Sequence, residues 1–201
     1  MNVCCIVGAG DCNKFDYKKQ SGDLIIAADG GYSHLKEYDV IPDIVIGDFD
    51  SLGYIPDDLS VIKLPAVKDV TDMYAAAEIG LEKGFKEFLI YGACGGRLDH
   101  TISNIQLAVS LTEKGNKCVI IDGNTKITAV CNGKIEFDET EMGYISVFAH
   151  SDNCTGVTIK GLRYTVENAT LTNSFPLGVS NEFIGSKASV TVENGTIVII
   201  Y

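Results

Sequence analysis

The pattern of the chain changes near residue 122, and this change constrains the fold more than any other feature. Before it, short apolar runs alternate with helical patterns, whereas after it only strand-like segments follow one another. Strands that are apolar throughout and separated by helices indicate a parallel sheet covered on both faces. Short strands joined by tight turns indicate an antiparallel sandwich or barrel. The sequence therefore predicts two structural parts.

The first part, residues 1–123, is predicted to be an α/β domain, Rossmann-like and three-layered, with a mostly parallel sheet flanked by helices. The expected strands are Val3–Val7, Leu24–Ala28, 44–46, 88–91 and 118–121. The expected helices are 32–38, 70–83 and 98–114. Thr71 suits the N-cap of the second helix and Gly84 its C-terminal stop. In the third helix, helical spacing places Leu98, Ile102, Ile105 and Val109 on one face.

The second part, residues 124–201, is predicted to be an antiparallel β-sandwich. Its expected strands are 127–130, 134–137, 144–149, 156–159, 164–171, 188–192 and 196–201. Turn signals such as Asn132-Gly133 and Asn194-Gly195 separate them. No helical period appears in this part, so the two parts are expected to meet near residues 122–125 without a flexible linker.

The net charge and the cysteine pattern limit which partners and which cellular compartment we expect for this protein. The formal net charge of −11 repels nucleic-acid backbones, so we expect no nucleic-acid partner. The seven cysteines form no CxxC pair, which favours free thiols in a reducing compartment. The first residues do not resemble a signal peptide, and no apolar run approaches the length of a membrane span. A cytoplasmic protein that does not contact a membrane is the expectation.

Carboxylates gather where the predicted parallel strands end. Asp29 follows the second strand, Asp48 and Asp50 follow the third, and Asp72 opens a helix. Ligands bind at the carboxyl ends of such strands. Asp48 and Asp50 are two residues apart and project to the same side if the segment is extended. Each aspartate alone could be a turn former or a helix cap, but their joint placement favours a Mg²⁺ site that bridges to phosphates.

A glycine-rich segment, residues 92–96, precedes the third helix. Its backbone N–H groups could approach a phosphate, and Arg97 adds a cation suited to phosphate oxygens. The alternative is a strand-to-helix turn with incidental glycines. Gly8-Ala9-Gly10 lacks the spacing of a dinucleotide fingerprint. His100 could be a general base or a structural residue of the first helical turn, and Lys68 could reach a phosphate or be solvated.

These motifs together resemble the thiamine pyrophosphokinase (thiamin diphosphokinase) family along nearly the whole chain. The segments that carry the resemblance are Ala28-Asp29-Gly30-Gly31, Gly47-Asp48-Phe49-Asp50-Ser51, Lys68-Asp69-Val70-Thr71-Asp72, Gly95-Gly96-Arg97-Leu98-Asp99-His100 and Ser180-Asn181-Glu182-Phe183. The resemblance implies transfer of a diphosphoryl group from ATP to the hydroxyethyl group of thiamine, giving thiamine diphosphate and AMP. It implies Mg²⁺ as the cofactor and a homodimer.

The resemblance also implies roles for individual residues. Its metal ligands would be Asp48, Asp50 and Asp72, and its catalytic residues Asp72, Arg97 and Asp99. Substrates would contact Asp29, Gly30, Gly31, Arg97, Ser180 and Asn181. Thiamine would lie between the α/β domain (1–123), which binds the nucleotide, and the partner's β-domain (124–201), which also serves dimerisation.

Two functions of other classes compete with this interpretation. One is a Mg²⁺-dependent nucleotide hydrolase that uses the same carboxylates to activate water. The other is a binding module without catalysis. The chain has no Trp to cover the thiamine ring, so Phe183 or Phe175 would provide an apolar wall or belong to the core. Asp99 and Asp72 both stay open as acceptors of the hydroxyl proton.

Overall fold

The computed structural model describes residues 2–47, 60–63 and 70–201, so the predicted roles of Asp48, Asp50 and Lys68 fall outside the described residues. The chain divides into two compact units. The α/β unit comprises residues 1–111 and 115–124, and the β unit comprises residues 112–114 and 125–201. Each unit has its own buried core, and each is described by itself below.

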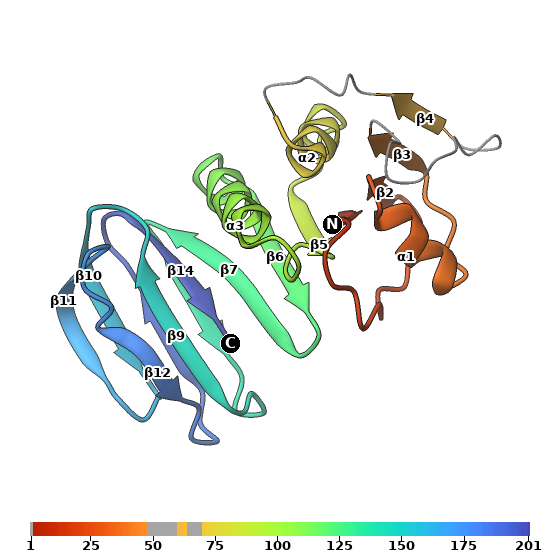
Figure 1. Cartoon of the computed structure of the whole chain (residues 1–201). Coiled ribbons are helices and arrows are strands. Elements are labelled where there is room, and N and C mark those ends of the chain that lie inside the picture. Colours follow the sequence, from red (N-terminus) through yellow and green to blue (C-terminus); the bar gives the residue numbers. More distant parts are fainter. Residues whose placement is uncertain (1, 48–59, 64–69) are drawn as a thin grey trace. The chain divides into compact units, whose positions relative to one another are not determined.

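Within residues 2–47, 60–63 and 70–124, the α/β unit has six parallel strands. They are β1 (Val3–Val7), β2 (Leu24–Ala28), β3 (Ile44–Gly47), β4 (Ser60–Lys63), β5 (Glu87–Tyr91) and β6 (Lys117–Asp122). Their order in the sheet is β6-β5-β1-β2-β3-β4 (Figure 1). The order therefore reverses at β1, because β2 to β4 are added on one side of it and β5 and β6 on the other. The predicted parallel sheet is confirmed.

Side chains of successive strand residues point to opposite faces of the sheet, and helices cover both faces. Helix α1 (Gly31–Glu37) packs over the face that buries Cys5 and Val7. Helix α2 (Asp72–Glu82) covers the opposite face, where its Gly80 lies against Cys4 and Phe88. Figure 1 shows the two helices on opposite sides of the strands. Because both faces are covered by helices, a strand such as β2 is apolar at every position.

Helix α3 (Leu98–Glu113) buries a different face from the one that apolar spacing selects. Leu98 is 72% exposed and Ile102 is 51% exposed. The buried residues are Asn104, Leu107, Ala108, Val109 and Leu111. Asn104, Leu107, Ala108 and Leu111 follow the helical period on one face, whereas Val109 belongs to the apolar stripe and is buried as well. Of the predicted apolar stripe, Val109 is buried but Leu98 and Ile102 are exposed, so spacing of large apolar residues alone does not identify the main buried face of α3.

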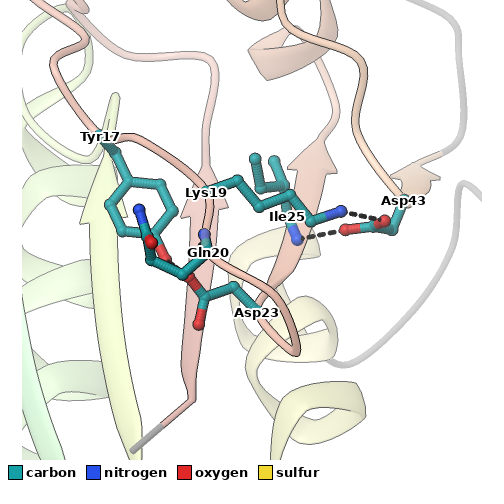
Figure 2. Close-up of polar contacts among 6 residues, drawn as sticks. All are labelled: Tyr17, Lys19, Gln20, Asp23, Ile25 and Asp43. Atoms are coloured by element: carbon teal, nitrogen blue, oxygen red, sulfur yellow. Dashed lines mark hydrogen bonds and ion pairs between the residues drawn. The ribbon is translucent and has the colours of Figure 1, made fainter.

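Carboxylates near the amino ends of the strands accept hydrogen bonds from backbone N–H groups of strand residues. Asp23 Oδ1 accepts from the N–H of Val3 at 2.8 Å, and its other oxygen accepts from the hydroxyl of Tyr17. Asp43 Oδ2 accepts from the N–H of Ile25 at 2.7 Å, and Asp43 Oδ1 pairs with Lys19 (Figure 2). Burial would raise the pKa of Asp23, but these hydrogen bonds outweigh it and hold that pKa below its usual range.

The β unit consists of two antiparallel sheets around one core. In the first, the strands of this unit have the order β12 (Gly178–Glu182), β9 (Tyr144–Ala149), β14 (Thr196–Ile200) and β7 (Thr125–Cys131). The second has the order β11 (Val166–Thr172), β10 (Asn153–Lys160), β13 (Ala188–Thr191) and β8 (Lys134–Phe137). Residues of both sheets, such as Val147 and Val190, share the buried cluster. The predicted sandwich is confirmed.

Two strands were absent from the sequence prediction. Strand β4 is short and lies mostly outside the core, so it lacks the apolar signature of its neighbours. Strand β12 is polar, and its pairing with β9 shifts register between Gly178 and Asn181. Among the described residues, no helix is both long enough and apolar enough to cross a membrane.

Candidate active site

A cavity of about 520 Å³ opens at the carboxyl ends of β1, β2 and β5, where the strand order reverses. Every lining residue belongs to the α/β unit. The lining residues are Ala9, Gly10, Ala28, Asp29, Val70, Thr71, Asp72, Met73, Gly92, Ala93, Gly95, Arg97, His100 and Asn104. Open α/β sheets bind ligands at such a reversal, because adjacent loops diverge there and leave a crevice. This cavity is the candidate active site.

Two glycine-containing turns cross at the floor of this region. The first turn (residues 8–10) follows β1, and the glycine loop (residues 92–96) follows β5. A Cβ on Gly92 would lie 2.3 Å from the carbonyl oxygen of Gly8, and Gly92 has a φ of 60°. A Cβ on Gly10 would lie 2.3 Å from the carbonyl oxygen of Cys94. Glycine is required at this crossing because the two backbones touch.

Three successive carbonyl groups of the glycine loop are held by donors. The N–H of Gly10 donates to the carbonyl of Gly92 at 2.9 Å, and the N–H of Asp11 donates to that of Cys94 at 2.7 Å. Between them, the Nδ2 of Asn104 donates to the carbonyl of Ala93 at 2.7 Å. The first turn and α3 therefore fix the orientation of three peptide planes.

The two hydrogen bonds to the carbonyls of Gly92 and Cys94 determine where the N–H groups of Ala93 and Gly95 point. A trans peptide places its carbonyl and N–H on opposite sides. Holding the carbonyls of Gly92 and Cys94 therefore turns the N–H groups of Ala93 and Gly95 away from the first turn. Within the described part of the chain, neither N–H group has an acceptor. Ala93 and Gly95 both line the cavity, and two backbone N–H groups on one side of a tight loop suit an anion.

The structure brings two of the predicted carboxylates to the cavity. Asp29 follows β2 with a φ of 50°, a conformation that aspartate tolerates, and its N–H donates to Ile46. Asp72 is the first residue of α2, whose N-cap Thr71 accepts from the N–H of Tyr74 at 3.2 Å. The positive end of the helix dipole favours a carboxylate at this position. Among the described residues, no three His, Cys, Asp or Glu side chains form a metal-binding group.

Arg97 and Asp99 form an exposed, two-pronged ion pair at the start of α3. Arg97 Nε donates to Asp99 Oδ1 at 3.2 Å, and a terminal guanidinium nitrogen donates to Oδ2 at 2.6 Å. The hydrogen bond from Arg97 lowers the pKa of Asp99 below its usual range, so this carboxylate is ionised at neutral pH. Arg97 and His100 line the cavity, whereas Asp99 itself does not. The pair holds a planar cation at the rim of the cavity.

Four predicted substrate-binding residues lie outside the lining. Gly30 and Gly31 begin α1, and a Cβ on Gly31 would lie 1.9 Å from the carbonyl oxygen of Val7. Gly31 therefore permits α1 to pack on β1. Ser180 and Asn181 lie on β12 of the β unit, and the amide of Asn181 pairs with the backbone of Tyr164 at 2.9 and 2.7 Å. The roles predicted for these residues toward substrates stay predictions.

Asn104 is the most informative lining residue that sequence reasoning missed. It is 5% exposed, lines the cavity and holds the middle carbonyl of the glycine loop. One signal could have identified it. Asn104 shares the i, i+3, i+4, i+7 spacing of Leu107, Ala108 and Leu111, and a polar residue on a buried stripe needs a partner.

Family comparisons cover both units. The sequence model described as thiamin pyrophosphokinase, catalytic domain, matches residues 15–120, which is more than half of the chain. The model described as thiamin pyrophosphokinase, vitamin B1 binding domain, matches residues 133–197. The chain belongs to the thiamin pyrophosphokinase family. The family predicted from the sequence motifs is thus confirmed, and the candidate active site lies largely within the catalytic-domain match.

Individual members of the thiamin pyrophosphokinase family support this assignment. The thiamine pyrophosphokinase of Bacillus subtilis (strain 168) is 30% identical over 184 residues, covering 88% of this chain and 86% of the relative. A crystal structure of thiamine pyrophosphokinase from Bacillus subtilis has a TM-score of 0.88 at 28% identity, covering 98% of this chain and 97% of that one. A crystal structure of thiamin pyrophosphokinase from Geobacillus thermodenitrificans has a TM-score of 0.82 at 27% identity, covering 98% and 96%. This chain is accordingly an enzyme of diphosphoryl transfer to thiamine.

Proposed function

We propose that the cavity of the α/β unit binds the triphosphate of ATP for this transfer. The thiamine hydroxyl oxygen forms a bond to the β-phosphorus, the bond from that phosphorus to the α-phosphate oxygen breaks, and AMP leaves. The hydroxyl proton leaves to a carboxylate or to water. The observation that supports this most is the convergence of backbone donors, two carboxylates and a guanidinium on one cavity at the sheet reversal. Phosphoryl-type transfer needs mainly such positioning and charge stabilisation.

The anion-binding side of the proposed site consists of the glycine loop and Arg97. The N–H groups of Ala93 and Gly95 would donate to phosphate oxygens, since they have no acceptor among the described residues. The guanidinium of Arg97 is exposed and has more donors than Asp99 occupies. It would contact the polyphosphate while Asp99 holds its plane.

The carboxylates at the cavity fit a magnesium ion. Mg²⁺ takes oxygen ligands and, in nucleotide sites, uses one or two carboxylates together with phosphates and waters. Asp29 and Asp72 provide two such groups, and Asp48 and Asp50 are the further ligands predicted from the sequence. When bound, Mg²⁺ would neutralise charge on the phosphate oxygens. Without a cation, these carboxylates would repel ATP.

A covalent intermediate on the protein is not part of this proposal. Cys94 is the cysteine of the glycine loop, and burial raises the pKa of its thiol to about 11. A thiol with that pKa is protonated at neutral pH, and the thiolate is the nucleophilic form. Asp72 and Asp99 stay the two predicted proton acceptors, of which Asp72 lines the cavity. Direct transfer between the two substrates is the simpler route.

The proposed homodimer concerns the β unit, which carries exposed apolar side chains. These are Met142, Tyr144, Tyr164, Phe175, Leu177, Val179 and Ile184. Phe183, by contrast, is buried and packs edge-on against Phe137, so it belongs to the core. Large apolar side chains exposed to solvent suit a protein interface. Sedimentation velocity at micromolar concentration is expected to give a dimer, and a monomer would contradict the proposal. The cytoplasmic location stays a prediction from the sequence.

Product analysis tests the proposed reaction. Incubation with ATP, thiamine and Mg²⁺ is expected to give AMP and thiamine diphosphate in equal amounts, and chelation of Mg²⁺ should abolish both. Formation of ADP would exclude diphosphoryl transfer. Release of phosphate or pyrophosphate without a requirement for thiamine would favour the hydrolase instead. Calorimetry that shows tight binding without turnover would favour a binding module.

A further inference from the structure

The buried amide of Asn104 donates to the glycine loop, and the proposed function assigns no role to this hydrogen bond. Asn104 lies on the inner face of α3, is 5% exposed and lines the cavity. Its Nδ2 donates to the carbonyl of Ala93 at 2.7 Å, across eleven residues of chain. A buried polar side chain is costly unless it is paired, so this contact accounts for an amide on an otherwise apolar stripe.

The hydrogen bond from Asn104 holds the Ala93–Cys94 peptide, which is the middle one of three successive peptides with a held carbonyl. The flanking carbonyls of Gly92 and Cys94 are held by backbone donors of the first turn. The carbonyl of Ala93 is the one held by a side chain. The Ala93–Cys94 peptide lies within a loop bounded by Gly92 and Gly95, whose φ values of 60° and 80° are in the left-handed region that favours glycine. Without Asn104, the carbonyl of this middle peptide would lose the partner that fixes its orientation.

The geometry points to Asn104 as a positioning residue for polyphosphate binding. By holding the carbonyl of Ala93 toward α3, it fixes the Ala93–Cys94 peptide, which joins the two peptides that carry the N–H groups of Ala93 and Gly95, and so keeps those two peptides in one relative arrangement for an anion. This inference rests on the proposed function, because it requires that the glycine loop binds the phosphates of ATP. It assigns Asn104 no contact with the reacting atoms, and its effect is expected in ATP affinity.

The test replaces the amide by a side chain of similar shape that cannot donate. Asn104→Leu is expected to raise the Kd for ATP about tenfold or more in calorimetry with Mg²⁺ and without thiamine, since the loop loses one ordering hydrogen bond. The Kd for inorganic tripolyphosphate should rise by a similar factor, and the KM for thiamine should change less than twofold. The parallel loss for ATP and tripolyphosphate assigns the effect to the phosphates.

A matched control exists on the same unit. Asn116 is also 5% exposed, and its Nδ2 also donates to a backbone carbonyl, that of Leu111 at 3.0 Å, but it does not line the cavity. Asn116→Leu is expected to leave both Kd values within twofold of wild type. If Asn104→Leu does not fold, Asn104→Ser and Asn116→Ser provide the same comparison, with a smaller expected rise in the Kd for ATP at position 104.

The outcomes separate this inference from the proposed function. Equal affinities of the variants at positions 104 and 116 for ATP, with normal binding by the wild type, would overturn the inference alone. A thiamine KM that rises as much as the Kd for ATP would also overturn it, since a general distortion of the site would be the cause. Failure of the wild-type chain to bind ATP would overturn the proposed function and the inference with it.

Discussion

Asp72→Asn is expected to lower kcat about 100-fold or more, while the fold stays intact. The carboxylate of Asp72 lines the cavity at the start of α2, where it is proposed to bind Mg²⁺ and to contribute to catalysis. Asparagine has nearly the same shape but no charge. Removing a group that stabilises developing charge commonly costs factors of about 100 to 1,000 in kcat. Steady-state kinetics across a range of Mg²⁺ concentrations measures the effect, and the half-saturating Mg²⁺ concentration should rise as well.

Glu82→Gln provides the control for this charge loss. Glu82 is the last residue of the same helix, is exposed and lies outside the cavity lining. Its substitution removes an equal charge from α2 and is expected to leave kcat within twofold of wild type. If Asp72→Asn retained wild-type turnover and Mg²⁺ dependence, Asp72 would have to be removed from both the metal site and the catalytic residues.

Gly31→Ala is expected to destabilise the protein by about 3 kcal/mol or more. A Cβ at this position would lie 1.9 Å from the carbonyl oxygen of Val7 and 2.5 Å from its carbonyl carbon. Both atoms are backbone of the buried strand β1, so relief requires α1 to move away from the sheet. Overpacking that displaces backbone costs about 1–3 kcal/mol and occasionally more. Urea unfolding monitored by circular dichroism gives the loss of unfolding free energy.

The neighbouring glycine separates packing from ligand binding. A Cβ on Gly30 would lie 3.0 Å from the Cβ of Ala9, a side-chain atom, so the neighbour must shift only slightly. Gly30→Ala is expected to cost less than about 1 kcal/mol. A Gly31→Ala variant with wild-type unfolding free energy but weakened ATP binding would show that Gly31 acts on the substrate rather than on packing.

The sequence motifs predicted the location of the site more reliably than they predicted the roles of individual residues. Asp29, Asp72 and Arg97 were predicted from their places at strand and helix ends, and all three line the cavity. Gly31 belongs to the same family motif as Asp29, yet its position is explained by contact with β1. A motif records that a residue type is needed and does not say whether a ligand or a neighbouring strand requires it.

The sequence by itself determined the architecture and the edge where ligands bind. Apolar strands alternating with helices indicate a parallel sheet, and the carboxyl ends of parallel strands meet at one edge, where Asp29 lies after β2. Both conclusions depend only on local pattern and on rules that hold for all such sheets. The convergence of Asp48 and Asp50 on that edge stays a prediction.

Only the tertiary structure decided which face of α3 is buried and how the glycine loop is held. The first turn and the glycine loop are more than 80 residues apart in the chain, yet their backbones touch, and Asn104 reaches the loop from the buried face. Such contacts depend on how closely separate segments approach one another. Local pattern carries no information on that distance, because helical period and turn chemistry act over only a few residues.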